Sequence, residues 1–219
     1  MTNYIIGIDD AARGPVIGPM ILAGVIIKDT EKDKIKETEA IDSKLLTPSK
    51  RKLIGEKIKK DFTHHIEVTS PEEIDASPNL NNLEAIKTAM IINKLSKDIT
   101  GKIEVIVDCP SVNIKKWSEF VEKLVDKKET TTIKAEHKAD FNHPIVSAAS
   151  IIAKEKREEE VKKLRDKIKI DFGSGYPSDP KTVEFIKKYY DDEKYSKIIR
   201  HSWSTVKKLK NNTNQKKLF

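Results

Sequence analysis

Few features of this 219-residue sequence suggest a secreted, membrane or fibrous protein. It has a single cysteine, Cys109, which excludes an internal disulfide and is typical of a reducing compartment. The longest uncharged apolar stretch, residues 14–27, contains two prolines and three glycines, so it predicts a turn and a strand. A membrane span would need ~20 uninterrupted apolar residues. The N-terminus lacks the basic start and apolar core of a signal peptide. We therefore expect a cytoplasmic globular protein with no membrane partner.

The net charge of +7 is unevenly distributed along the chain. Residues 194–219 contain eight Lys or Arg and no Asp or Glu, whereas the first 193 residues carry 34 basic and 35 acidic side chains. A basic segment that includes Tyr195 and Trp203 fits a polyanion, and nucleic acid is the obvious candidate. A solvated, frayed tail is an equally good interpretation of the same charges.

Apolar patterning predicts strands alternating with helices. The predicted strands cover residues 4–8, 19–27, 65–69, 103–107 and 131–136. The predicted helices cover residues 48–60, 83–95, 114–125, 144–169, 178–190 and 202–209. In the second of these helices, apolar residues recur at helical spacing at Leu83, Ile86 and Ala89 or Met90, with Asn93 and Lys94 facing outward. The alternation indicates an α/β sheet with helices on both faces, followed by a helical C-terminal quarter.

Four aspartates fall where predicted strands end. Asp9 and Asp10 follow the first strand, Asp108 follows the fourth, and Asp140 lies just after the fifth. Ligands of open α/β sheets bind beyond the carboxyl ends of the strands. Clustered carboxylates repel one another, and without Cys or His at ligand spacing they favour hard cations such as Mg²⁺ or Mn²⁺. For any one of these acids, above all Asp140, a turn residue or helix cap is the alternative interpretation.

The segment that follows Asp10 contains glycine and arginine but is not a phosphate-binding P-loop, because it lacks the terminal Gly-Lys-Ser/Thr. Its backbone amides and Arg13 could still face a sugar or a phosphate.

Six segments in the same order resemble the ribonuclease HII family, most closely its archaeal branch. They are residues 7–19, 42–48, 108–111, 135–154, 173–182 and 200–203. The first reads Gly-Ile-Asp-Asp-Ala-Ala-Arg-Gly-Pro-Val-Ile-Gly-Pro, and the fifth reads Gly-Ser-Gly-Tyr-Pro-Ser-Asp-Pro-Lys-Thr. The resemblance extends from residue 4 to about residue 208, which is nearly the whole chain.

The resemblance implies a ribonuclease H-like α/β fold: a mixed sheet with flanking helices and a small C-terminal helical subdomain. It implies a catalytic domain over residues 1–170 and a helical subdomain over residues 171–210, and we expect a disordered tail over residues 211–219. It further implies a monomeric, divalent-metal-dependent endonuclease. Such an enzyme hydrolyses the RNA strand of RNA–DNA hybrids, cuts at single ribonucleotides in duplex DNA, and leaves 3′-hydroxyl and 5′-phosphate ends.

The family's functional residues map onto positions of this sequence. The metal-binding catalytic acids correspond to Asp9, Asp10, Asp108 and Asp140, where two Mg²⁺ or Mn²⁺ ions would stabilise the attacking and leaving oxygens. The residues implied to bind substrate are Ala12, Arg13 and Gly14 of the ribose-sensing loop, Lys44 beside the phosphate backbone, and Tyr176 at the ribose.

Two positions depart from the family pattern. The second acid is normally glutamate but here is Asp10, which is shorter by one methylene, and the first glycine of the ribose-sensing loop is Ala12. Alanine suits that position poorly if the backbone needs a positive φ. The alternative function is therefore an RNA–DNA hybrid-binding protein with an impaired catalytic site.

The last five residues resemble the start of a sliding-clamp-binding peptide. Gln215 is followed three residues later by Leu218 and then by Phe219, where the pattern stops. A truncated clamp-binding peptide and a coincidence are both open. Trp203 is interpreted as a packing anchor of the last helix, with contact to nucleic acid as the alternative.

Overall fold

The computed structural model describes residues 2–38, 40 and 46–216, with side chains up to residue 210. Two compact units make up the chain. The first comprises residues 1–11, 21–67 and 79–156, and the second comprises residues 12–20, 68–78 and 157–219. The second unit thus includes two short segments from the N-terminal half in addition to the C-terminal helices. The order of the elements along the chain does not predict that these two segments belong to the second unit.

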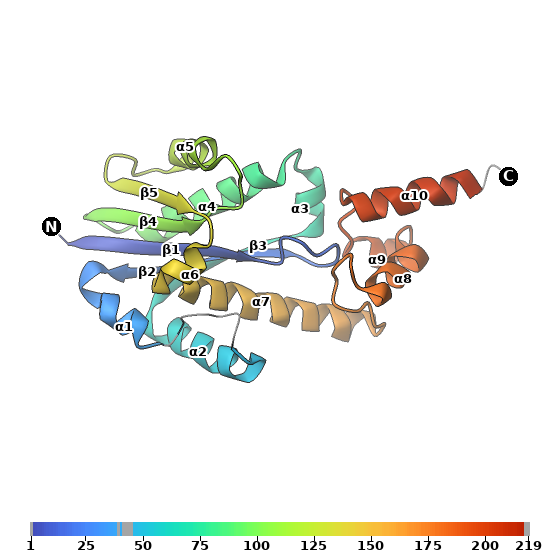
Figure 1. Ribbon diagram of the computed structural model, residues 1–219, viewed down its shortest axis with the longest axis horizontal. Coiled ribbons are helices and arrows are strands. Elements are labelled where there is room, and N and C mark those ends of the chain that lie inside the picture. The colour runs from blue at the N-terminus through green and yellow to red at the C-terminus, as the bar shows by residue number, and fades with distance from the viewer. Residues whose placement is uncertain (1, 39, 41–45, 217–219) are drawn as a thin grey trace. The chain divides into compact units, whose positions relative to one another are not determined.

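A mixed five-stranded sheet provides the framework, in the order β3-β2-β1-β4-β5 (Figure 1). The strands are β1 (Asn3–Ala11), β2 (Met20–Lys28), β3 (Thr63–Thr69), β4 (Lys102–Asp108) and β5 (Thr131–Glu136). β1 pairs antiparallel with β2 and parallel with β4, which in turn pairs parallel with β5. The carboxyl ends of β1, β4 and β5 therefore meet at one edge of the sheet.

Helices connect these strands and form the C-terminal part. They are η1 (Asp29–Glu31), α1 (Lys32–Lys36), α2 (Pro48–Asp61), α3 (Pro71–Ala76), α4 (Leu80–Ser96), α5 (Ile114–Leu124), α6 (Ala139–Asn142), α7 (Pro144–Ile168), α8 (Pro180–Tyr189), α9 (Glu193–Ser196) and α10 (Ser204–Lys216). Several begin with the local chemistry that favours helix starts. Thr47, for example, caps α2 by accepting from the Lys50 N–H, with Pro48 in the first turn.

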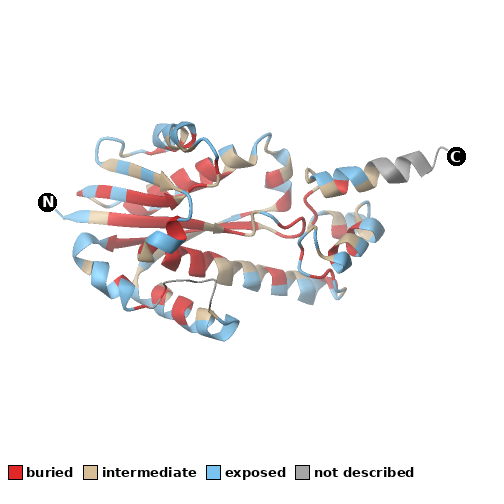
Figure 2. Ribbon diagram, in the orientation of Figure 1, coloured by how far each residue is buried: buried red, intermediate tan, exposed pale blue. Residues whose placement is uncertain are grey.

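The sheet of the first unit is covered on both faces (Figures 1 and 2). The N-terminal part of α7 lies directly against β1, because a Cβ added to Gly7 would sit 2.5 Å from the backbone carbonyl carbon of Ile145. On the opposite face, the Ile91 side chain of α4 packs against Gly24 of β2. These two contacts bury the central strands, whose apolar residues are nearly all inaccessible.

The second unit has a separate aromatic core. Phe185 makes edge contacts with Phe172 and Tyr195, at centroid distances of 5.9 Å each. Val16 and Ile199 complete this core, so the segment that follows β1 packs with the C-terminal helices.

The predicted α/β class and all five strands are confirmed, but two details of the helices differ. Helices α1, α3, α6 and α9 are too short to produce a periodic apolar pattern. α10 continues through residue 216 and so includes most of the segment for which the sequence predicts disorder. Within the described residues, no helix has the length and apolar character needed to cross a membrane.

The predicted helix over residues 83–95 is confirmed as α4, but not all of its regularly spaced apolar residues are buried. Ile86 and Met90 are 40% and 43% exposed, whereas Glu84 and Lys87 are buried. Lys87 lies 3.7 Å from the Glu67 carboxylate, which compensates for the burial of its charge. α4 therefore turns a partly polar face toward the molecule's interior.

Candidate functional site

The parallel pairing of β1 and β4 places three of the predicted acids at the same end of the sheet. Ile8 pairs with Val107, so the residues that follow both lie at the strand ends. Asp9 and Asp10 are within β1, which extends to Ala11, and do not follow the strand as the sequence suggested. Asp108 is the last residue of β4.

Asp9, Asp10 and Asp108 line one small pocket in the first unit. The other lining residues come from strands, loops and two helices: Ile8, Leu22, Glu84, Thr88, Val107, Pro110 and Trp117. Side chains alternate along a strand, so Asp9 shares the face of Gly7 and α7, and Asp10 shares the face of Ile8 and α4. The pocket thus collects carboxylates from both sides of the sheet edge.

Asp9 is the most perturbed of these acids. It is only 5% exposed, and one of its carboxylate oxygens accepts the Asp10 N–H at 2.8 Å. Burial raises its pKa well above the ordinary value, and the negative charges of Asp10 and Asp108 raise it further. The Ser150 hydroxyl on α7 and the Asp10 amide favour the charged form, but these effects are smaller in total.

Asp140 reaches the neighbourhood of these acids through a short helix. Lys138 adopts a left-handed conformation (φ 60°), which turns the chain after β5 into α6. The Ala139 N–H then donates to the Asp108 carboxylate at 3.2 Å. Asp140, the next residue, is itself buried. The residue before Asp140 is therefore hydrogen-bonded to Asp108, which connects the fourth predicted acid to the third.

The donor set suits a hard divalent cation. Oxygen ligands are the type that Mg²⁺ and Mn²⁺ prefer. Burial, and then the charges of Asp10 and Asp108, raise the pKa of Asp9, and a bound cation would favour its charged form. Within the described part of the chain, no three acidic, histidine or cysteine side chains already lie in metal-binding geometry. A cation would therefore have to draw these carboxylates together.

The predicted ribose-contact residues lie in the second unit. Ala12 has a φ of +67°, so the backbone is left-handed where the family pattern has glycine. A Cβ on Gly14 would be 3.4 Å from the Tyr176 ring, which places these two residues in contact range. The Arg157 guanidinium lies 5.5 Å from the centroid of that ring and donates to the Ser174 carbonyl at 3.0 Å. Arg13 belongs to the same loop, whereas Lys44 lies outside the described residues.

Several side chains near the acids were assigned no site role by the sequence. Glu84 lines the acid pocket and is 1% exposed, and its only sequence signal was a charge at a helix position that tertiary packing buries. His137 and His143 contact the Cys109 carbonyl at 2.9 Å and the Glu136 carboxylate at 2.5 Å. Those bonds are of the kind that gives a histidine a structural role.

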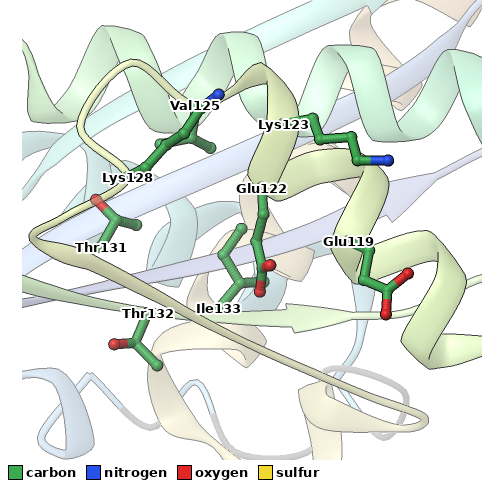
Figure 3. Close-up of a pocket in the computed structure, with 8 residues that line it drawn as sticks. All are labelled: Glu119, Glu122, Lys123, Val125, Lys128, Thr131, Thr132 and Ile133. Carbon is green, nitrogen blue, oxygen red and sulfur yellow. The ribbon is translucent and has the colours of Figure 1, made fainter.

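A larger hollow lies elsewhere on the first unit, between α5 and β5 (Figure 3). Its volume is about 470 Å³, and it is lined by Glu119, Glu122, Lys123, Val125, Lys128, Thr131, Thr132 and Ile133. None of these is a predicted site residue. Their mixed charges and threonine hydroxyls do not converge on a common point in Figure 3, so the acid pocket remains the candidate site.

Comparison with known proteins identifies the family to which the chain belongs. A family model described as Ribonuclease HII matches residues 6–206. Ribonuclease HII of Pyrococcus furiosus is 39% identical over 96% of this chain and 93% of its own length. The ribonuclease H2 structure from Pyrococcus horikoshii OT3 superposes with a TM-score of 0.84 at 34% identity, covering 96% of this chain and 99% of that one. In the PCNA:RNase HII complex from Archaeoglobus fulgidus, the matching chain has a TM-score of 0.80 at 36% identity, with 94% and 96% coverage.

The fold is thus that of the ribonuclease H class of nucleases. Within that class, the chain belongs to the ribonuclease HII family, the type II ribonuclease H endonucleases.

Proposed function

We propose that this protein is a metal-dependent endonuclease that hydrolyses the RNA strand of RNA–DNA hybrids and cuts 5′ to single ribonucleotides in duplex DNA. It leaves 3′-hydroxyl and 5′-phosphate ends and acts in the cytoplasm, in ribonucleotide removal and primer clearance. The observation that supports this most directly is the pocket shared by Asp9, Asp10 and Asp108 at the ends of two parallel strands.

The four acids would act by holding cations. Asp9, Asp10, Asp108 and Asp140 supply the oxygen ligands, and Mg²⁺ or Mn²⁺ bound there would stabilise the negative charge that develops on the attacking and leaving oxygens. Because Asp9 is buried beside like charges, its carboxylate holds a proton more tightly than usual until a cation displaces it. Cation binding at this pocket is therefore expected to weaken at acid pH, where a proton competes for the Asp9 carboxylate.

Selectivity for ribose would come from the loop that follows β1. We propose that Ala12, Arg13 and Gly14 contact the 2′-hydroxyl, the group that distinguishes RNA from DNA. Tyr176, 39% exposed and next to Gly14, would pack against the same sugar. Lys44 would contact the phosphate backbone.

A cleavage assay tests this function. The substrates are a DNA duplex with one ribonucleotide and an RNA–DNA hybrid, each with Mg²⁺ and with Mn²⁺. We expect cleavage 5′ to the single ribonucleotide and a loss of at least ~10³-fold in Asp9→Asn, because the charge that holds the cation is removed. Asp126→Asn, the same charge change at an exposed position, is the matched control and should cleave normally.

The opposite result would favour the alternative function. Tight hybrid binding without cleavage in either metal would indicate a hybrid-binding protein, which Asp10 and Ala12 would explain. In that case Asp10→Glu combined with Ala12→Gly should restore cleavage if those two departures are the cause.

We further propose that residues 215–219 bind a sliding clamp of the PCNA type. The support is the order of Gln215, Leu218 and Phe219 together with the Archaeoglobus fulgidus complex. Gln215 lies in α10 without a described side chain, and residues 217–219 lie outside the described residues. A clamp pull-down that is unchanged by deletion of residues 215–219 would disprove this interaction.

A further inference from the structure

Arg200 is wholly buried in the second unit, and its guanidinium binds the loop that follows β1. Its Nη2 donates to the Ala12 carbonyl at 2.8 Å, its Nη1 to the Arg13 carbonyl at 2.9 Å, and its Nε to the Gly18 carbonyl at 2.9 Å. Its exposed fraction is 0%. These three acceptors are neutral backbone carbonyls within residues 12–18.

Trp203 extends the same contact. Its indole Nε1 donates to the Gly14 carbonyl at 3.1 Å, and its ring lies 4.9 Å from the Arg200 guanidinium carbon. Three consecutive carbonyls, those of residues 12–14, are therefore bound by this pair of side chains, which we call the Arg200–Trp203 clasp.

The clasp fixes the direction of the loop amides. A trans peptide places the carbonyl of one residue and the N–H of the next on opposite sides of the peptide plane. Because the carbonyls of Ala12 and Arg13 point to the buried guanidinium, the N–H groups of Arg13 and Gly14 point away from it. These two donors are thus turned toward the outside of the loop.

Other contacts hold the clasp itself in place. The Asp75 carboxylate accepts the N–H groups of His201 and Ser202 at 2.7 and 2.8 Å. The Arg200 N–H donates to the Val16 carbonyl at 2.8 Å, beside the bridge between Ile17 and Ile199. A guanidinium is costly to bury, so general packing of the second unit does not by itself require an arginine here.

We propose that Arg200 is a positioning residue for ribose recognition, which presents the Arg13 and Gly14 amides to the 2′-hydroxyl of the substrate. The inference rests on the proposed function, because it assigns the holder of the loop that is proposed to contact ribose. Arg200 itself, being buried, touches no substrate.

The test compares Arg200→Lys with Arg165→Lys. Lysine keeps the charge but loses the fork of donors that reaches three carbonyls. Arg165 is a matched control, because it donates to a single loop carbonyl, that of Gly173 at 2.9 Å, and also lies over an aromatic ring, Phe172. Each protein is assayed well below its melting temperature.

Two readouts separate positioning from general stability. The first is the affinity for a duplex with one ribonucleotide divided by the affinity for the all-DNA duplex of the same sequence, measured without divalent metal. We expect this ratio to fall about tenfold in Arg200→Lys, as for loss of one hydrogen bond, and to stay constant in Arg165→Lys. The second is kcat/KM on the single-ribonucleotide duplex, which should fall ~10²-fold because a misplacement of ~1 Å has that effect.

Trp203→Phe keeps an aromatic ring near Arg200, although a smaller one, and loses the donor to Gly14, so it tests the same idea should Arg200→Lys fail to fold. It should lower the affinity ratio in the same direction. If the wild type cleaves and either folded variant keeps the wild-type ratio, the positioning role is wrong while the proposed function stands. If the wild type cleaves neither substrate, the proposed function fails and this inference fails with it.

Discussion

The left-handed backbone at Ala12 should reduce the stability of the wild-type protein. Its φ of +67° is a region that an L-residue with a Cβ enters at a cost of roughly 1–2 kcal/mol. Glycine enters this region without that cost. It also gives the unfolded chain more conformational freedom, which offsets about 0.4–1 kcal/mol of the gain. Ala12→Gly should therefore raise the free energy of unfolding by about 0.5–1 kcal/mol, contrary to the usual loss on replacing alanine with glycine.

Urea denaturation at neutral pH, followed by circular dichroism, measures this change. For a chain of this length the corresponding rise in Tm is about 1–4 °C. Ala12→Val is the opposite variant, because a β-branched side chain at positive φ is more strained than alanine, and it should destabilise the protein.

Lys169→Gly is the matched control. Lys169 follows α7 with a φ of 56°, and its N–H donates to the Arg165 carbonyl at 2.9 Å. The same replacement there should give a similar gain in stability, with no effect on ribose selectivity. A loss of about 0.5–1 kcal/mol in Ala12→Gly, as for an ordinary alanine in regular structure, would refute the reasoning.

Two further predictions concern the first unit. Gly7→Ala should destabilise the protein by about 1–3 kcal/mol, because the new Cβ would lie 2.5 Å from the Ile145 backbone and α7 would have to move; a urea midpoint equal to wild type would contradict this close packing. Asp9→Asn, with a chelator present, should be more stable than wild type at pH 7. The folded-state pKa of Asp9 is raised above its ordinary value of 3.8. Ionisation of Asp9 therefore lowers the free energy of unfolding of the wild type as the pH rises above 3.8, and the variant lacks this loss. The two proteins should converge near pH 3, and urea midpoints that differ equally at pH 3 and pH 7 would oppose the assignment.

The sheet and its acidic edge could be predicted from the sequence because both follow from short-range patterns. Apolar runs marked the strands, and Asp108 directly followed one of them. Parallel pairing of β1 with β4 then brings Asp9 and Asp108 to the same edge, as the rule for α/β sheets expects.

The orientation of α4 could not be predicted in this way. Its sequence offers apolar residues around much of the helix, so spacing alone does not select the buried face. Two tertiary contacts determine the buried face. Ile91 packs into the space that Gly24 leaves, and Glu84 lines the acid pocket. Both partners lie far away in the sequence, and neither is visible from the helix itself.

The loop after β1 shows why the departure at Ala12 need not abolish function. A local rule would expect alanine to relax toward negative φ and so to alter the loop. The Arg200–Trp203 clasp opposes this, because it binds the carbonyls of residues 12–14 from a segment almost two hundred residues later. The hydrogen bonds of a buried guanidinium are each of the order of the strain they oppose, about 1.5–3 kcal/mol. The left-handed backbone is thus retained at Ala12 without glycine. We expect its strain to lower the free energy of unfolding, and Ala12→Gly should relieve that strain.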